Sequence, residues 1–221
     1  LETKKLFNEK YFNYEKGFYG QNSQSGNAIP LNIGLCPEGY EEKVIKNIVD
    51  DIVAHDYHLT TGNQGYKHML EILAENGYED VAIKIITNET YPGWGYMIAN
   101  GATSIWERWE KEMDSTMNSF CHPMHGSVDY WFYKYLGGID ADKNADGFDT
   151  IVIKPLIPTD IDYVKSEFES PRGKIVSNWE KKDGKVYYHI EIPASSKARI
   201  ILKNKKEFIV YNGTYDFVEE M

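Results

Sequence analysis

The hydrophobic pattern of this chain changes once, near residue 145, and this change limits the folds open to it. Before that point apolar residues recur every three or four positions, as in residues 38–56, where Val and Ile form one stripe. After it, short β-branched and aromatic runs alternate with polar residues. The first pattern is typical of amphipathic helices and the second of half-buried strands. The sequence therefore predicts an α+β protein with a helical domain over residues 1–144 and a β domain over residues 145–221.

Several helices can be placed within the first domain. The stripe of residues 38–56 repeats over residues 64–77 and stops at Asn76-Gly77, a common signal for the C-terminal end of a helix. A shorter helix is expected over residues 78–90. Residues 126–139 are apolar nearly all round, so we expect the helix that they form to be well buried.

The second domain is expected to consist of short strands joined by tight turns. Asp183-Gly184 and Asn212-Gly213 each lie between two strand-like runs, and such dipeptides are strong hairpin signals. Residues 184–193 and 197–203 have the pattern of two separate strands. Successive hairpins of this kind predict an antiparallel β-sandwich.

Charge and hydropathy exclude some partners. The chain has 24 Lys and Arg against 34 Asp and Glu, a net charge of -10, which argues against a nucleic-acid partner because phosphate binding needs clustered basic residues. No apolar run approaches the roughly 20 residues of a membrane span, so no membrane partner is expected. Two cysteines, Cys36 and Cys121, are too few for a disulfide scaffold and leave the cellular compartment open.

The stretch DADKNADGFD, residues 140–149, has part of a calcium-loop pattern. Asp142, Asn144 and Asp146 occupy the first alternate positions of such a loop, but the twelfth position is Ile153 instead of Glu. A polar turn between the two domains is therefore the preferred interpretation.

The six histidines offer no convincing metal site. His55 and His58 lie three residues apart, but no nearby carboxylate completes a tetrahedral set of ligands. The chain also has no phosphate-binding or dinucleotide-binding fingerprint. We therefore predict neither a metal nor a cofactor.

Three loops rich in Gly, Thr, His and Trp connect the helices, at residues 55–65, 90–109 and 119–127. Each places polar groups beside glycine, where the backbone can approach a ligand closely. We expect the ends of the helices, and not their faces, to line a functional site.

Glu107 is the candidate for chemistry within these loops. Trp106 and Trp109 flank it in sequence, and a partly desolvated carboxylate is a stronger proton acceptor. The alternative is a surface glutamate with Arg108 as its neighbour. The sequence alone does not decide between the two.

Two histidines and one further tryptophan are weaker candidates. His122 precedes Pro123, which favours a loop conformation, so its ring could bind a substrate hydroxyl or cap the next helix. His125 could reach the same region. Trp94 lies between two glycines, and an exposed indole there would suit the apolar face of a sugar.

Several motifs together resemble the bacterial α-L-rhamnosidases. The resemblance is carried by TYPGWGYMIANGATSIWERWE at residues 90–110 and CHPMHGSVDYWFYKYLGGI at residues 121–139, and by the longer stretch at residues 21–62. Residues 148–158 and 170–200 resemble the C-terminal β-sandwich of the same family. The match runs in order through nearly the whole chain.

The resemblance implies part of an (α/α) barrel of six helical hairpins, with the active site at one mouth, followed by the β-sandwich. It implies hydrolysis of terminal α-L-rhamnose with inversion, so the partner would be a rhamnose-containing glycoside or polysaccharide. Glu107 falls where the family has its general base, and His122 at a sugar-contacting position. Trp94 and Trp106 would help to shape the sugar pocket. The chain departs from the family at Cys121, often Asn, and at His125, often Phe or Leu.

The resemblance also implies that something is missing. Inversion needs two carboxyl groups about 6.5–9.5 Å apart, and the family's general acid lies upstream of anything seen here. We therefore expect a C-terminal portion of a longer enzyme, inactive alone and prone to self-association. The alternatives are a helical-barrel glycosidase for another sugar, or a non-catalytic carbohydrate-binding or structural unit.

Overall fold

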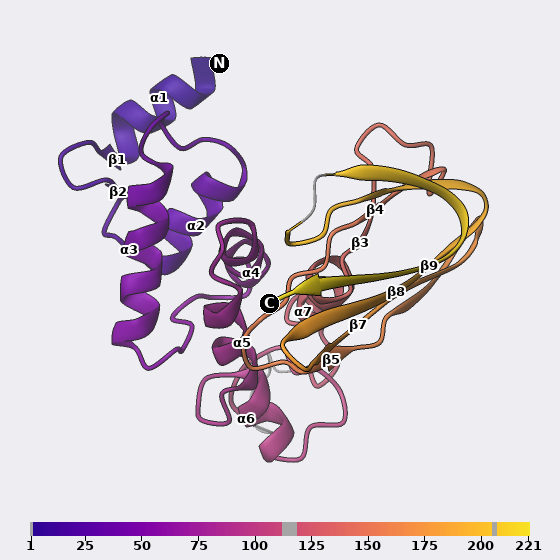
Figure 1. Ribbon diagram of the computed structural model, residues 1–221. Helices are drawn as coiled ribbons and strands as arrows, with labels where there is room; N and C mark the ends of the chain where they lie inside the picture. Colours follow the sequence, from indigo (N-terminus) through magenta and orange to yellow (C-terminus); the bar gives the residue numbers. More distant parts are fainter. Residues whose placement is uncertain (1, 112–118, 205–206) are drawn as a thin grey trace. The chain divides into compact units, whose positions relative to one another are not determined.

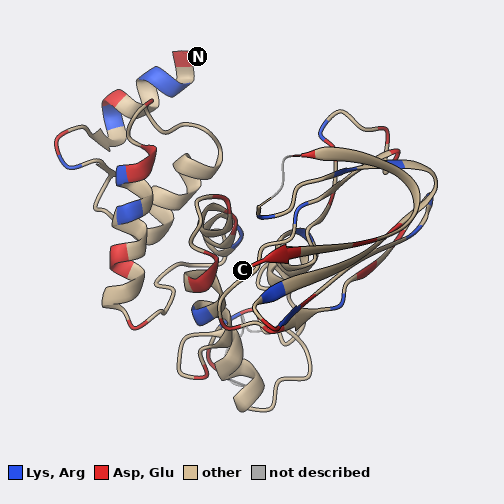
Figure 2. Cartoon of the chain, in the orientation of Figure 1, with Lys and Arg blue, Asp and Glu red and all other residues tan. Residues whose placement is uncertain are grey.

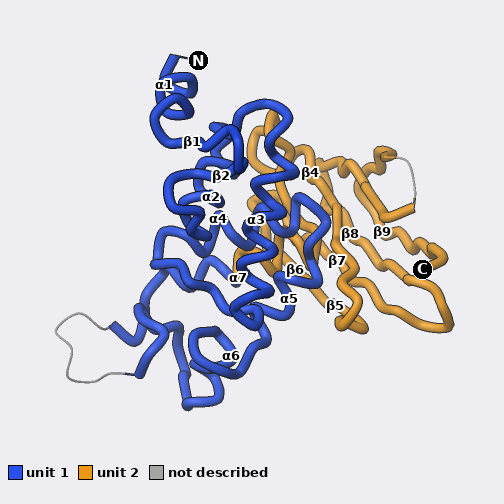
Figure 3. Tube along the Cα trace, turned by 90° about the vertical axis from the view of Figure 1, so that its left-hand side faces the viewer, with its two compact units in different colours: residues 1–128 blue, residues 129–221 orange. Residues whose placement is uncertain are grey.

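The computed structural model describes residues 2–111, 119–204 and 207–221 (Figure 1). Contacts between residues divide the chain into two compact units, Leu1–Val128 and Asp129–Met221 (Figure 3). We describe each unit by itself.

The first unit is helical. Consecutive helices α2 and α3 pack on each other, as do α4 and α5, and α2 also packs on α4. Such pairs agree with the helical hairpins expected from the sequence. The elements are α1 (Glu2–Tyr11), β1 (Phe12–Asn13), β2 (Phe18–Tyr19), α2 (Gln24–Asn32), α3 (Glu41–Ala54), α4 (Tyr66–Glu75), α5 (Glu79–Thr87) and α6 (Trp94–Ala99).

Helices α3, α4 and α5 confirm the three predicted from residues 38–56, 64–77 and 78–90. In α3 the apolar stripe is buried along one face, at Val44, Ile45, Ile48 and Ile52. Burial of this face stabilises the helix more than its intrinsic propensity does, since isolated helices of this length are marginal in water. The opposite faces carry charges of both signs, as the mixed red and blue of α1 and α3 show (Figure 2).

The apolar segment near residue 130 is only half buried. It forms α7 (Ser127–Trp131), which continues as a π-helix, η1 (Phe132–Leu136). Trp131, Tyr135 and Leu136 are buried, whereas Tyr130, Phe132 and Tyr133 are at least 36% exposed. The expectation of a helix buried on all sides is therefore wrong. Two of the three exposed rings carry a hydroxyl, which can stay in water while the ring packs. Self-association of the chain stays a prediction.

The second unit is a seven-stranded sheet with strand order β3-β4-β8-β7-β5, to which β6 and β9 add by pairing with β7 and β8. Its strands are β3 (Ile139–Ala141), β4 (Thr150–Ile153), β5 (Tyr163–Val164), β6 (Glu167–Ser170), β7 (Gly173–Lys182), β8 (Lys185–Ile200) and β9 (Phe208–Glu220). The predicted β-rich C-terminal domain is thus confirmed. In the described part of the chain one pair departs from the antiparallel pattern, because β4 runs parallel to β8.

Strand β8 pairs with different strands along its length. Its first half pairs with β7 and its second half with β4, with a shift in the β9 register between Ile192 and Lys197. Figure 1 shows β8 and β9 curving together. Side chains from both halves, such as Ile190 and Ile200, belong to one hydrophobic core. The two strands predicted at residues 184–193 and 197–203 are therefore one bent strand.

The two dipeptide turns have different outcomes. Asp183 and Gly184 have φ angles of 51° and 75° and connect β7 to β8, so the first hairpin is confirmed. Gly213 lies inside β9 and pairs with Ile192 beside the register shift, so the second hairpin is wrong. Glycine at this position marks an irregularity in the strand instead of a turn.

The polar stretch at residues 140–149 closes a hairpin of the second unit. Strands β3 and β4 pair on either side of it, and the Asp142 carboxylate accepts a hydrogen bond from the Asn144 backbone N–H at 3.0 Å. The polar turn is confirmed, but it does not connect two domains. The division expected between residues 144 and 145 would fall inside this hairpin, whereas the compact units meet between Val128 and Asp129.

None of the helices described is long and apolar enough to cross a membrane.

Gly138, at the entry to the sheet, offers a test of this fold. Its φ is +71° and an added Cβ would overlap the backbone of Lys154 and Pro155. Gly147 has a similar φ of +68°, but open space around it. We expect Gly138→Ala to lower the free energy of unfolding by about 2 kcal/mol more than Gly147→Ala, because both add backbone strain and one also adds a clash. Urea denaturation of both variants measures this, and equal losses would contradict the packing described here.

Candidate active site

Trp94 begins α6 and points inward. A Cβ on the neighbouring Gly95 would lie 2.5 Å from the Asn88 carbonyl oxygen, so the chain passes too close for any other residue. The Trp94 indole is 3% exposed, and its Nε1 donates to the His125 carbonyl oxygen at 3.0 Å. The expectation of an exposed indole is wrong at this position. Its role in sugar binding stays a prediction.

Trp94 belongs to an aromatic cluster formed with Tyr66, Trp109 and His125. The His125 ring stacks on Trp109 with centroids 4.2 Å apart, and it lies 4.3 Å from Tyr66. Trp94 meets Trp109 edge to face at 5.0 Å. All four side chains are buried. The cluster is therefore a packed aromatic core beside the loops that carry the candidate residues.

His125 connects this aromatic cluster to the loop that carries Glu107. Its Nδ1 lies 2.7 Å from the Trp106 carbonyl oxygen, which can only accept, so Nδ1 carries the proton. Nε2 is buried and has no hydrogen-bond partner within the described residues. Burial lowers the pKa of His125 to about 4, against the opposing effect of the Trp106 carbonyl. The imidazole is therefore neutral near neutral pH.

Two loop segments, residues 104–107 and 119–122, lie side by side. The Glu107 N–H donates to the Ser119 carbonyl oxygen, and the Ser119 N–H donates to Glu107 Oε2, both at 2.8 Å. The His122 N–H donates to the Ile105 carbonyl oxygen at 2.9 Å. These bonds hold Glu107 and His122 on adjacent segments and fix the direction of the carboxylate.

The surroundings of Glu107 bear on the two interpretations of the sequence. The side chain is half-buried, and the neighbouring Arg108 forms its ion pair with Glu110. Both interpretations of Glu107, a carboxylate that does chemistry and a surface glutamate with Arg108 as its neighbour, therefore stay predictions. The Nδ1 of His122 accepts a hydrogen bond from the Met124 N–H at 3.3 Å, so this ring helps to shape its own loop.

Two cavities flank the paired segments. One has a volume of about 430 Å³ and includes Asn63, Gln64, Lys67 and His68 from one side and Pro123 and Met124 from the other. The second has a volume of about 260 Å³ and includes Ser104, Trp106, Lys111 and Phe120. Trp106 is thus buried to 3% exposure and still borders a hollow. Neither Glu107 nor His122 is among the described lining residues.

The three loops selected from the sequence are connected by hydrogen bonds. His58 Nε2 lies 2.8 Å from Thr90 Oγ1, and Asn88 Nδ2 donates to the Asp56 carbonyl oxygen at 3.1 Å. The bonds of Trp94 and His125 then tie residues 90–109 to residues 119–127. That the helix ends beside these loops line a functional site stays a prediction. Within the described residues, no group of three or more His, Cys, Asp and Glu side chains is placed to hold a metal ion.

Sequence reasoning missed two contributors to this site. Tyr66 fits the apolar stripe of α4, and nothing in that stripe shows that its ring meets two indoles. Ser119 contributes its backbone N–H, which no side-chain pattern can reveal. Alternation of Trp and polar residues in two loops was the available signal, and it pointed to the region without giving the contacts.

The first unit thus consists of paired helices whose connecting loops hold a carboxylate, histidines and indoles, and a β-rich unit follows it. Residues 1–136 match the family model described as bacterial alpha-L-rhamnosidase 6 hairpin glycosidase domain. Residues 138–214 match the one described as bacterial alpha-L-rhamnosidase C-terminal domain. The chain belongs to the bacterial α-L-rhamnosidase family, and the resemblance noted from its motifs is confirmed.

Individual relatives agree with this assignment. An α-L-rhamnosidase of Streptomyces avermitilis is 30% identical over 184 residues, covering 80% of this chain and 18% of the relative. One from Formosa agariphila is 31% identical over 196 residues, covering 86% of this chain and 20% of the relative. The chain thus spans about a fifth of the length of these relatives.

Solved structures give the same picture. A structure of an α-L-rhamnosidase from "Dictyoglumus thermophilum" superimposes with a TM-score of 0.89 at 32% identity, covering 99% of this chain and 28% of that chain. The Streptomyces avermitilis enzyme, solved in complex with L-rhamnose, gives a TM-score of 0.89 at 26% identity, covering 98% of this chain and 23% of that chain. The fold described above is therefore that of the corresponding part of these enzymes.

Proposed function

We propose that this chain is part of an α-L-rhamnosidase that releases terminal α-L-rhamnose with inversion, and that Glu107 is the general base. The observation that carries the proposal is the fixed direction of the Glu107 carboxylate. One of its oxygens, Oε2, is held by the Ser119 N–H at 2.8 Å. Its loop is anchored on the aromatic cluster through the Trp106 carbonyl oxygen and His125.

The chemistry follows from this geometry. In an inverting glycosidase one carboxylate deprotonates a water molecule that attacks the anomeric carbon, while a carboxylic acid protonates the leaving oxygen. Because Oε2 of Glu107 accepts from Ser119, we assign Oε1 to the attacking water. A base held in one direction needs no reorientation during the reaction, which lowers the entropic part of the barrier.

The other predicted residues surround this base. His122 is placed on the segment paired with that of Glu107, so we assign its ring to a sugar hydroxyl. The buried rings of Trp94 and Trp106 would act as walls that support the pocket instead of surfaces on which the sugar stacks. Binding of L-rhamnose is supported by the Streptomyces avermitilis structure, which contains that sugar.

We assign no residue of this chain as the general acid. Acid assistance typically contributes about 10²–10⁴-fold to the rate, so residues 1–221 alone are expected to be inactive. The full-length protein encoded by the gene would supply the acid and the remaining helical hairpins.

The proposed function can be tested with the full-length protein and an aryl α-L-rhamnoside. We expect turnover of this substrate, no comparable turnover of the matched aryl glucoside, and none by residues 1–221 alone. Proton NMR during the reaction should show β-L-rhamnose before the anomers equilibrate. Release of α-L-rhamnose first would exclude inversion, and preference for the glucoside would assign the barrel to another sugar.

A further inference from the structure

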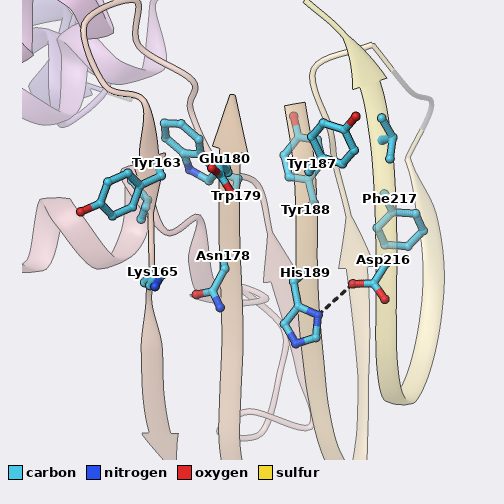
Figure 4. A pocket seen from close by; sticks show the side chains of 12 residues that line it. Tyr163, Lys165, Asn178, Trp179, Glu180, Tyr187, Tyr188, His189, Asp216 and Phe217 are labelled. Atoms are coloured by element: carbon cyan, nitrogen blue, oxygen red, sulfur yellow. Dashed lines mark hydrogen bonds and ion pairs between the residues drawn. The ribbon is translucent and has the colours of Figure 1, made fainter. Parts of the chain in front are cut away.

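A cavity of about 490 Å³ lies on the outer face of the sheet in the second unit, over β5, β7, β8 and β9 (Figure 4). Its volume is within the range of small-molecule sites. All of its lining residues belong to the second unit, so it is distinct from the loops around Glu107.

The pleat of the strands determines which side chains face this cavity. Trp179 and Tyr188 point into the hydrophobic core, where Trp179 Nε1 donates to the Leu136 carbonyl oxygen at 2.8 Å and the Tyr188 hydroxyl donates to Glu219 at 3.0 Å. The residues beside them on each strand therefore project from the opposite face. These are Asn178, Glu180, Tyr187 and His189.

One row across this face holds two tyrosines and a valine, with Glu180 between the tyrosines. Tyr163 pairs with Glu180, Glu180 with Tyr187, and Tyr187 with Val218, so the four form a line across β5, β7, β8 and β9. Tyr163 is 61% exposed, Tyr187 40% and Val218 45%. The two tyrosines stand on strands two steps apart, roughly 10 Å at the backbone. Their ring faces are accessible while their hydroxyls stay in water.

The next row is polar and held by hydrogen bonds. Asn178 Oδ1 accepts from the Ser166 N–H at 2.9 Å, which leaves its amide N–H groups as donors. His189 Nδ1 lies 2.8 Å from Asp216 Oδ1, and its Nε2 lies 3.2 Å from Glu191 Oε1. Figure 4 shows Asn178, His189 and Asp216 side by side, with the His189–Asp216 bond drawn.

This row presents both donors and acceptors. The hydrogen bonds that the His189 ring donates to the Asp216 and Glu191 carboxylates raise the pKa of His189, and the ring is held between the two carboxylates. The Asp216 side chain is still 78% exposed and can accept from a ligand. The lining thus holds two carboxylates, Glu180 and Asp216, together with the Lys165 ammonium and the His189 imidazole. Such a balance favours an uncharged ligand over an anion or a cation.

A pyranose sugar has the chemistry that this face requires. It combines apolar C–H surfaces, which pack on tyrosine rings, with hydroxyls that both donate and accept. We infer that the second unit binds one uncharged pyranose residue of a glycan, on Tyr163 and Tyr187 and with hydroxyls on Asn178 and Asp216. That the sugar is L-rhamnose rests on the proposed function. The exposed Val218 beside Tyr187 would then contact the methyl group of this 6-deoxy sugar.

The test uses residues 1–221 with ¹³C-labelled tyrosine rings and methyl α-L-rhamnoside as the probe. NMR titration should show saturable shifts of the Tyr163 and Tyr187 ring signals, assigned from the Tyr163→Phe and Tyr187→Phe variants. Tyr187→Ala should weaken binding by about tenfold, since stacked aromatic side chains often dominate binding energy. Asp216→Ala should weaken it as well.

The matched control is Tyr211→Ala, which removes a tyrosine of β9 that is 68% exposed and does not line the cavity. We expect it to leave binding unchanged. Glu107→Gln should also leave these tyrosine shifts unchanged, which separates this site from the proposed active site. Absence of saturable shifts at Tyr163 and Tyr187, or equal weakening by Tyr211→Ala, would overturn the inference. Either result would leave the rhamnosidase assay of the full-length protein unaffected.

Discussion

Glu107→Gln in the full-length protein is expected to reduce kcat for an aryl α-L-rhamnoside by about 10²–10⁴-fold, the usual contribution of a positioned general base. Glutamine keeps the length of the side chain and an oxygen that can accept from the Ser119 N–H, now at 2.8 Å from Oε2. It cannot take a proton from water. The loss should therefore fall on kcat, while binding of L-rhamnose measured by calorimetry changes little.

Glu42→Gln is the control for this experiment. It removes one carboxylate from the exposed first turn of α3, away from the loops of the site, so kcat should stay within about twofold. Glu107→Asp adds a second comparison, because it keeps the carboxylate and withdraws it from the water. We expect its rate to lie between those of the unmodified protein and Glu107→Gln. If Glu107→Gln retains more than about a tenth of the rate, Glu107 is not the base.

The helical part of this fold was predictable because its signal is local. The stripe of α3 repeats every four residues, and burial of Val44, Ile48 and Ile52 follows from that spacing. The half exposure of residues 127–136 was not predictable, because an apolar sequence does not state how much surface its neighbours can cover. Phe132, for example, is apolar and is still 36% exposed.

The β domain shows where local signals mislead. Asp183-Gly184 forms the expected turn, because β7 and β8 have the alternation to pair on either side of it. Asn212-Gly213 has the same chemistry but lies opposite the register shift of β8, and the long strand β8 continues to pair with β9 past it. Pairing across many residues overrides the preference of a single dipeptide.

The sequence predicted which segments form the candidate site, but not how their side chains are arranged. Glycine, histidine and tryptophan in three loops indicated which segments meet, and hydrogen bonds such as Trp94 to His125 connect them. The sequence could not show that the Trp94 indole turns inward, because its packing partners, Tyr66 and Trp109, lie elsewhere in the chain. It also could not separate His125, fully buried, from the half-buried His122.

His125→Phe is expected to change how the stability of residues 1–221 depends on pH. A histidine in the unfolded chain has a pKa of about 6.5, whereas burial lowers the pKa of His125 to about 4. Between these values the unfolded chain takes up a proton that the folded chain excludes. The contribution of neutral His125 to the free energy of unfolding is therefore complete above pH 6.5 and is lost as pH falls toward 4.

The size of this effect follows from the gap between the two pKa values. Each unit corresponds to 1.36 kcal/mol, so lowering the pH from 7 to 4.5 should cost about 2.5 kcal/mol through His125 alone. Phenylalanine does not titrate and keeps an aromatic ring at this buried position. At pH 7 it should cost about 1–3 kcal/mol, because the Trp106 carbonyl oxygen loses its donor. At pH 4.5 the unmodified chain should have lost most or all of that advantage.

Urea denaturation at pH 7, 5.5 and 4.5 gives the difference between the two chains directly, and other titrating groups cancel in that difference. His55→Gln serves as the control for loss of a histidine, because its side chain is 49% exposed and lies outside the aromatic cluster around His125. A His125→Phe difference that is independent of pH would mean that the His125 ring accepts a proton in place. It would then not be the neutral link between the aromatic cluster and the Glu107 loop.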